Sequence, residues 1–170
     1  MARQVGMGKV RTMRFEASRA DLIKPLQLVT GVIERRQTLP ILANLLLKVS
    51  EDQLSLVGTD LEVELIGRIP LVSAEPGDIT VPARKLMEIC RELPEQATLA
   101  IKQEEQRLVI QSGRFRSTLS TLPASEFPTV DRAEISDEIE IASSSLKRLL
   151  DRTSFAMAHQ DVRYFLNGLL

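Results

Sequence analysis

Tryptophan is absent from this chain of 170 residues, and aromatic residues make up only 4% of it. The interior must therefore be built from Leu, Ile and Val, which the 44% hydrophobic content supplies. A single cysteine, Cys90, excludes an internal disulfide bond and any metal site made of several cysteines. One thiol suits a reducing cytoplasm, where we expect the protein to act. No hydrophobic run approaches the roughly 20 residues of a membrane-spanning helix, so we expect no membrane partner.

A surplus of basic residues is also missing. Lys and Arg total 22 against 23 Asp and Glu, which gives a net charge of −1. Proteins dedicated to binding duplex DNA usually carry a basic surplus. Either nucleic acid is not the partner, or the basic groups are gathered on one face.

Residues that could form an active site are few. His159 is the only histidine, and it could pair with Asp161 in AHQD (158–161), but no nucleophile motif accompanies them. Asp60 and Glu62 in GTDLE (58–62) could imitate a metal-binding pair, but a solvated turn is favoured because no third ligand is near. The sequence therefore predicts no enzyme, no metal ion and no cofactor.

The apolar spacing predicts an α+β domain over residues 13–122, a large antiparallel sheet with two helices on one face. One helix begins after Ser18, which with Asp21 forms a capping-box-like start, and the second spans 83–93, with Cys90 buried on its apolar side. Strands are expected at 13–18, 43–50, 53–59, 62–72, 79–82, 97–103, 107–112 and 115–122.

The rest of the chain is expected to hold a linker and an incomplete second domain. Residues 123–136 are rich in Pro, Ser and acids and have no apolar period, which is typical of a linker. A strand at 138–142, a helix with Leu146, Leu149 and Leu150 inward, and a strand-like segment at 164–170 bury too little for a domain. We therefore expect residues 137–170 to be the truncated start of a second one. Residues 1–12 are expected to be a disordered extension.

Basic residues recur on the polar sides of the predicted helices. They are Lys24 on the first helix with Arg35 and Arg36 after it, Arg84, Lys85 and Arg91 on the second, and Lys147, Arg148 and Arg152 on the third. Amphipathic helices need a polar outer face in any case, and Glu88, Glu92 and Asp151 are interspersed among these residues. Composition alone therefore favours a solvated surface.

Several segments together resemble the bacterial DNA polymerase III sliding clamp family, in order and at matching separations. They are LPILANLLL (39–47), GTDLE (58–62), VPARK (81–85), STLPASEFP (120–128) and AMAHQDVRYFLNG (156–168). The match runs from about Met13 to Leu170 and would cover the first of the family's three domains and the opening of the second. The resemblance implies DNA-clamp domains, and a head-to-tail homodimeric ring whose helices face double-stranded DNA. A ring that encloses DNA needs only weak attraction to phosphates, which would explain the balanced charge.

The resemblance also implies roles for particular residues. The DNA-contacting positions fall on Arg36, Arg84, Gln160, Tyr164 and Phe165, to which we add Lys24 from the first helix. A groove for short peptides of the replicative polymerase and clamp loader matches at Arg163 and Leu166. The edge strand 114–122 would join a second subunit through Lys85, Arg114, Arg116 and Leu119. Here Phe165 replaces a frequent Tyr, and Ser117 stands where an aromatic residue is common.

Three hypotheses follow. The leading one is a processivity factor that encircles duplex DNA and tethers the replicative polymerase without catalysis. The alternative is a protein-interaction module that uses its sheet edge and does not bind DNA. The third is a hydrolase that uses His159 and Asp161, and the lack of a nucleophile motif counts against it.

Overall fold

The computed structural model describes residues 12–33, 39–128, 139–158 and 161–169. The chain divides into two compact units, residues 1–131 and 132–170, and each is described by itself below. Among the described residues, no helix is long and apolar enough to cross a membrane.

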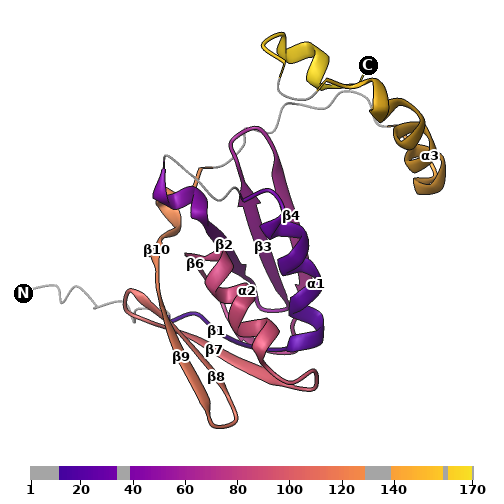
Figure 1. The fold of residues 1–170 in the computed structure, drawn as a ribbon. Helices are drawn as coiled ribbons and strands as arrows, with labels where there is room; N and C mark the ends of the chain where they lie inside the picture. Colours follow the sequence, from indigo (N-terminus) through magenta and orange to yellow (C-terminus); the bar gives the residue numbers. More distant parts are fainter. Residues whose placement is uncertain (1–11, 34–38, 129–138, 159–160, 170) are drawn as a thin grey trace, which may run out of the picture. The chain divides into compact units, whose positions relative to one another are not determined.

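Two five-stranded antiparallel sheets form the first unit, in the orders β5-β1-β7-β8-β9 and β10-β6-β2-β3-β4 (Figure 1). The first sheet contains β1 (Arg14–Ser18), β5 (Ala74–Glu75), β7 (Thr98–Glu104), β8 (Arg107–Ser112) and β9 (Phe115–Ser120). The second contains β2 (Asn44–Val49), β3 (Gln53–Thr59), β4 (Glu64–Pro70), β6 (Gly77–Pro82) and β10 (Leu122–Pro123). The α+β class is confirmed. The strands, however, are divided between two sheets instead of forming one large sheet.

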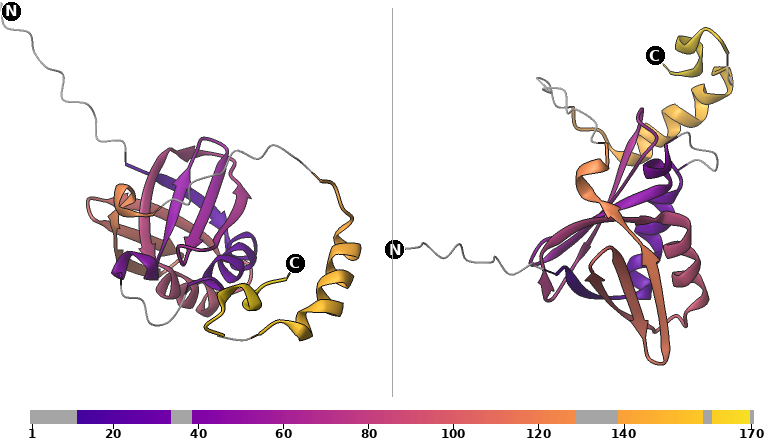
Figure 2. Two further views of the ribbon diagram at one scale, coloured as in Figure 1. Left: turned by 90° about the horizontal axis from the view of Figure 1, so that it is seen from above. Right: turned by 90° about the vertical axis from the view of Figure 1, so that its left-hand side faces the viewer.

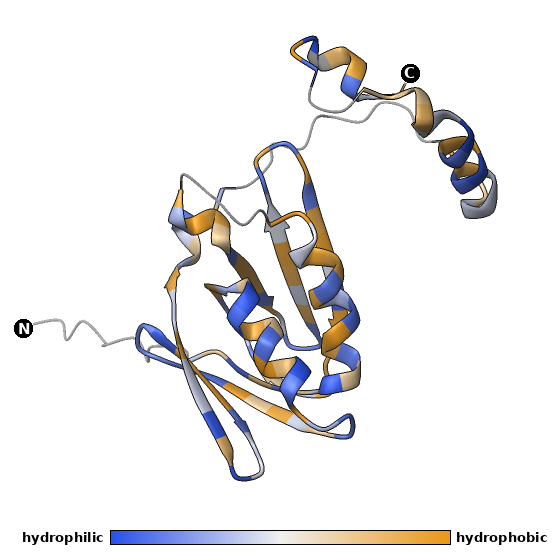
Figure 3. Cartoon of the chain, in the orientation of Figure 1, coloured by the Kyte–Doolittle hydropathy of each residue, from blue (hydrophilic) through white to orange (hydrophobic). Residues whose placement is uncertain are grey.

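Two helices, α1 (Arg19–Thr30) and α2 (Ala83–Glu92), lie side by side and pack on the sheets (Figure 2). Ser18 caps α1 as predicted, because its Oγ accepts a hydrogen bond from the Asp21 backbone N–H at 3.0 Å. Hydrophilic and hydrophobic residues alternate along both helices (Figure 3), as expected of helices with one buried side. Their apolar residues and those of both sheets form one core, in which Phe15 is the only aromatic residue among those described.

Glycines allow α1 to lie unusually close to the second sheet. A Cβ atom at Gly67 on β4 would lie 2.6 Å from Cβ of Pro25, which is inside α1. A Cβ atom at Gly58 on β3 would lie 2.7 Å from Cγ1 of Val29. Any larger residue at these two positions would have to push the helix away from the sheet.

The first unit continues past residue 122, so the predicted linker at 123–136 begins too early. Pro123 of β10 pairs with Ile79 of β6, at a sheet edge, where the missing N–H of a proline is tolerated. A 3₁₀ turn, η2 (Ala124–Glu126), then brings Phe127 against Leu46 and Val57, where it is only 5% exposed. This second cluster includes Ile41 of η1 (Pro40–Ala43), and it explains why β2 is buried on both faces.

The second unit contains α3 (Ser143–Thr153) followed by two 3₁₀ helices, η3 (Ser154–Ala156) and η4 (Tyr164–Asn167). The predicted helix is confirmed, but residues 139–142 form no strand, and η4 replaces the strand expected at 164–170. A strand needs a neighbour for its backbone hydrogen bonds, and the described residues of this unit provide none. The described residues of this unit also provide too little apolar surface to cover the leucines predicted to face inward, which are about half exposed: Leu146 at 44%, Leu149 at 52% and Leu150 at 46%.

Candidate nucleic-acid interface

Arginines join the α1/α2 pair at both ends. Arg19, the first residue of α1, donates a hydrogen bond from Nε to the backbone carbonyl of Cys90 near the end of α2, at 2.7 Å. Arg84, near the start of α2, donates from Nη2 to the carbonyl of Ile33, just beyond α1, at 3.4 Å. The two helices therefore run in opposite directions, and each arginine places positive charge at a helix C-terminus, where it is favourable.

The solvent-facing sides of the two helices carry charges of both signs. The exposed cationic residues are Lys24, Arg84, Lys85 and Arg91, and the exposed acidic residues are Asp21, Glu88 and Glu92. Two of the acids have partners in the chain: Asp21 accepts a hydrogen bond from Ser18 Oγ at 2.6 Å, and Glu88 forms a 2.8 Å ion pair with Lys85. Four exposed cations against three exposed acids leave this surface weakly positive, although the whole chain carries a net charge of −1.

The edge strand predicted to join another subunit is β9, which is outermost in its sheet. Arg116 is exposed on this strand, Arg114 is exposed in the turn just before it, and Lys85 is exposed on α2. Alternation along β9 turns the side chain of Leu119 toward the core, where it is 8% exposed, and its part in a subunit interface stays a prediction.

The GTDLE segment is a turn held by its own side chains, as predicted. Asp60 Oδ1 accepts hydrogen bonds from the backbone N–H groups of Glu62 at 2.9 Å and Val63 at 2.8 Å. Thr59 Oγ1 accepts another from Leu61, whose φ is +83°. Asp60 is therefore used by the backbone, and the described residues contain no group of three metal-binding side chains.

Cys90 is fully buried on α2, as expected. Burial raises the pKa of its thiol to about 11, although the charge of Arg19 acts in the opposite direction. The thiol is therefore protonated at neutral pH and is a poor nucleophile there.

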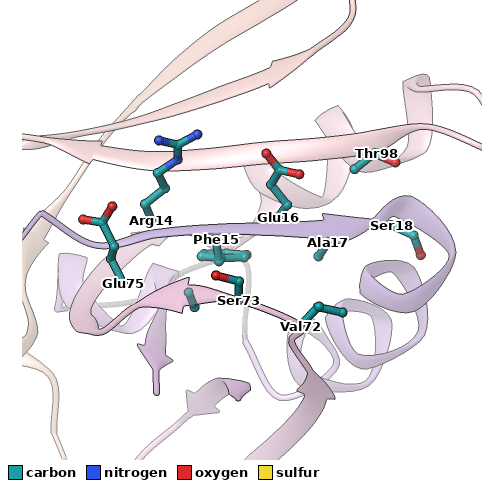
Figure 4. Close-up of a pocket in the computed structure, with 10 residues that line it drawn as sticks. Arg14, Phe15, Glu16, Ala17, Ser18, Val72, Ser73, Glu75 and Thr98 are labelled. Atoms are coloured by element: carbon teal, nitrogen blue, oxygen red, sulfur yellow. The ribbon is translucent and has the colours of Figure 1, made fainter. Parts of the chain in front are cut away.

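A pocket of about 560 Å³ lies at β1 and β5 (Figure 4). Arg14 and Glu16 project to one side of β1 and Phe15 to the other, while Val72 and Ser73 approach from the chain before β5. None of the residues that line it was predicted as a site residue. Ser18, which caps α1, is among the residues that line it.

In the second unit, a short loop is fixed by Asp161 and Asn167. The Asp161 carboxylate accepts hydrogen bonds from Arg163 Nε at 3.1 Å and Nη2 at 3.0 Å, which lower the pKa of Asp161 and raise that of Arg163. Asn167 exchanges two hydrogen bonds with the backbone of Asp161, both at 3.0 Å. Asp161 is thus engaged by Arg163, and this does not support a hydrolase that would use it with His159, which lies outside the described residues.

The comparisons with known proteins agree with this architecture. Residues 13–131 match the family described as DNA polymerase III beta subunit, N-terminal domain. The chain belongs to this family.

Relatives and solved structures of the family are longer than this chain. The beta sliding clamp of Pseudomonas aeruginosa is 62% identical over 159 residues, which are 93% of this chain and 43% of the relative. That of Escherichia coli is 52% identical with the same coverage. A crystal structure of the Pseudomonas aeruginosa DNA polymerase sliding clamp superposes with a TM-score of 0.88 at 61% identity, covering 92% of this chain and 42% of that one. The chain thus spans less than half the length of these proteins.

Of the residues predicted to contact DNA in this family member, the structure places Lys24 and Arg84 on one helix pair. Arg36 and Gln160 lie outside the described residues, and the side chain of Tyr164 is likewise not described. Phe165 lies in the second unit and is 68% exposed.

The sequence did not single out Arg19. The residue follows the N-cap of α1, where an acidic residue is the favoured type, so local rules gave it no role. Only the packing of α1 on α2 shows which carbonyl it meets. A basic residue at this position is the signal that could have identified it.

Proposed function

We propose that this chain forms the first domain and the start of the second domain of a DNA sliding clamp. Such a clamp encircles double-stranded DNA and tethers the replicative polymerase as a non-catalytic processivity factor in the cytoplasm. Two copies of the complete subunit would join head to tail. The names of the relatives support this proposal, and so does the weakly positive surface of the α1/α2 pair, where Arg84 is fixed beside Ile33.

The electrostatics of this surface suit enclosure better than tight binding. Counterions released from phosphates would supply a sequence-independent attraction to Lys24, Arg84 and Arg91. The interspersed Glu88 and Glu92 limit that attraction, so the contact would be weak enough to allow sliding. Arg84 keeps its charge while it donates to a neutral carbonyl, and it can therefore contact a phosphate at the same time.

The second unit would supply the remaining contacts. Phe165, together with Tyr164 and Gln160, would contact single-stranded DNA, because bases stack on aromatic rings regardless of sequence. Arg163 and Leu166 would form one side of the groove for short peptides from the polymerase and clamp loader. We further propose that the linker between the two domains lies within residues 129–136.

A hybrid protein tests the DNA-binding role, with this chain replacing the matching part of the Pseudomonas aeruginosa relative. Loaded by its clamp loader, the hybrid should remain on closed circular DNA and leave linear DNA from its ends. Arg84→Ala together with Arg36→Ala should shorten retention on circles as salt rises, and should reduce the slope of log affinity against log salt by about 1 for each lost phosphate contact. Arg107→Ala, at an exposed arginine on β8 outside the helix pair, is the control for the single variant Arg84→Ala, because each removes one positive charge.

Equal loss of the hybrid from circular and linear DNA would contradict the clamp function. The free β9 edge would then favour the alternative, a protein-interaction module without a DNA role. An effect of Arg107→Ala as large as that of Arg84→Ala would show that only total charge matters, and would argue against a DNA-facing helix pair.

A further inference from the structure

Two of the three cationic residues at the proposed subunit interface already have acidic partners within the chain. Lys85 Nζ lies 2.8 Å from Glu88 Oε2. Arg116 Nη2 lies 4.0 Å from Glu104 Oε2, and the other oxygen of Glu104 is 3.4 Å from Lys102. Arg114 differs, because no salt bridge among the described residues involves it.

The positions of these pairs follow from the fold. Glu88 is one turn beyond Lys85 on α2, at the i, i+3 spacing that brings side chains together. Glu104 ends β7 and Arg116 lies on β9, on either side of β8, and Glu104 opposes Arg107 while Arg116 opposes Gln111. Residues 104, 107, 111 and 116 therefore share the face of the sheet turned away from the core. All the paired side chains are about half exposed or more, so the ion pairs are accessible and easily exchanged.

We propose that Glu88 and Glu104 compete with an acidic partner surface for Lys85 and Arg116, and so weaken the assembly formed through the β9 edge. The inference rests on the proposed function, in which a second subunit joins at this edge. Association would require Lys85 and Arg116 to exchange an internal carboxylate for one of the partner. Arg114 would attract the partner without this exchange.

The competition predicts that removing Glu88 or Glu104 strengthens the association of the subunits. Each internal carboxylate lowers the positive potential of the edge, so its removal should speed the association of an acidic partner. Exposed ion pairs have small energies, and the expected gain is about two- to fivefold in dimer affinity for each residue. Salt should reduce the gain, because it screens exposed charges. A ring that opens during loading and unloading would benefit from such weakening.

The test uses the same hybrid with the Pseudomonas aeruginosa relative. Its subunit dissociation constant and association rate would be measured at low and high salt for the parent, Glu88→Gln and Glu104→Gln. Glu51→Gln is the matched control, because it removes one exposed negative charge from the turn between β2 and β3. We expect tighter dimers and faster association for the first two variants, and no change for the control.

Arg114→Ala and Arg116→Ala separate the possible failures. If they weaken the dimer while Glu88→Gln and Glu104→Gln leave it unchanged or weaken it, the competition is refuted but the interface stands. If the arginine variants also have no effect, the subunits do not join at β9, and both the inference and that part of the proposed function are overturned. If Glu51→Gln raised the dimer affinity as much as Glu88→Gln and Glu104→Gln do, net charge alone would explain the effect, and the proposed competition would also be refuted.

Discussion

Arg19 and Cys90 are joined by a hydrogen bond that ties the beginning of α1 to the end of α2, from Nε to the backbone oxygen at 2.7 Å. The opposite ends are joined by Arg84 and Ile33, but at 3.4 Å and with Arg84 exposed, whereas Arg19 is partly buried. The shorter, less solvated contact is the stronger one. The two arginines should therefore differ in function, with Arg19 holding the helix pair together and Arg84 supplying surface charge.

Arg19→Met should lower the free energy of unfolding by about 1–2 kcal/mol, because the Cys90 carbonyl loses a charged donor. Arg84→Met should cost no more than about 0.5 kcal/mol, as expected of an exposed side chain. Urea unfolding of the 170-residue chain, followed by circular dichroism, measures both. Arg19→Lys is the control for charge, since it keeps the cation but lacks Nε. Equal losses for Arg19→Met and Arg84→Met would contradict the difference between the two contacts.

Gly67→Ala should destabilise the first unit by about 1–3 kcal/mol, because the new Cβ would overlap Pro25 and force α1 off β4. Gly58→Ala should have a similar effect through Val29. The matched control is Gly168→Ala in the second unit, where a Cβ would meet no atom within 4 Å. Thermal unfolding of the three variants provides the comparison. A neutral Gly67→Ala would show that α1 can shift without loss of packing.

Local patterns predicted most elements of the first unit because each element is buried on one side. The alternation in 53–59 and 107–112 reproduces the observed strands β3 and β8. The division into two sheets was not predictable in this way, since it depends on pairings between distant segments, such as Arg14 with Lys102. The burial of Leu119 was not predictable for a related reason: the side of β9 that faces the core is decided by the helices and strands beneath it.

The candidate site was predictable only in part. Family resemblance located Arg84, but its contact with Ile33 and that of Arg19 with Cys90 arise from helix packing, and no local sequence pattern specifies which carbonyl each arginine meets. The strand predictions in the second unit were wrong because apolar content indicates that side chains are buried, but not which segment buries them. Hydrogen-bond partners for a strand are absent from its described residues, and a 3₁₀ turn satisfies more of the backbone locally.

Phe127→Ala should cost about 3 kcal/mol, because it empties the cluster that Phe127 forms with Leu46 and Val57. A chain that ends at residue 122 should be destabilised at least as much as this variant, whereas one that ends at residue 128 should match the first unit of the full chain. Urea unfolding of the two shortened chains tests whether the domain includes residues 123–128. Equal stability of the two shortened chains would support the domain boundary at residue 122 that the sequence predicts.

Cys90 should make the stability of the first unit depend on pH in the alkaline range. The pKa of its thiol is raised from 9.0 to about 11 in the folded chain, so the folded state favours the neutral thiol. A raised pKa gives a contribution that is complete below the unfolded value and is lost as pH rises through the folded value. The loss should therefore fall between about pH 9 and 11 and reach about 2–3 kcal/mol.

Comparison with Cys90→Ala isolates this effect, because the other groups that ionise at high pH are present in both proteins. The difference in unfolding free energy between the wild type and Cys90→Ala should be constant from pH 7 to 8.5 and should then shift against the wild type. In Arg19→Met the decline should begin at the same pH, which the unfolded thiol sets, but it should extend to higher pH and become larger, since the positive charge that lowers the folded thiol pKa is gone. Parallel curves of unfolding free energy against pH for the wild type and Cys90→Ala, up to pH 11, would contradict this prediction. They would show that the folded state tolerates the thiolate, and that the end of α2 opens to solvent more readily than the burial of Cys90 implies.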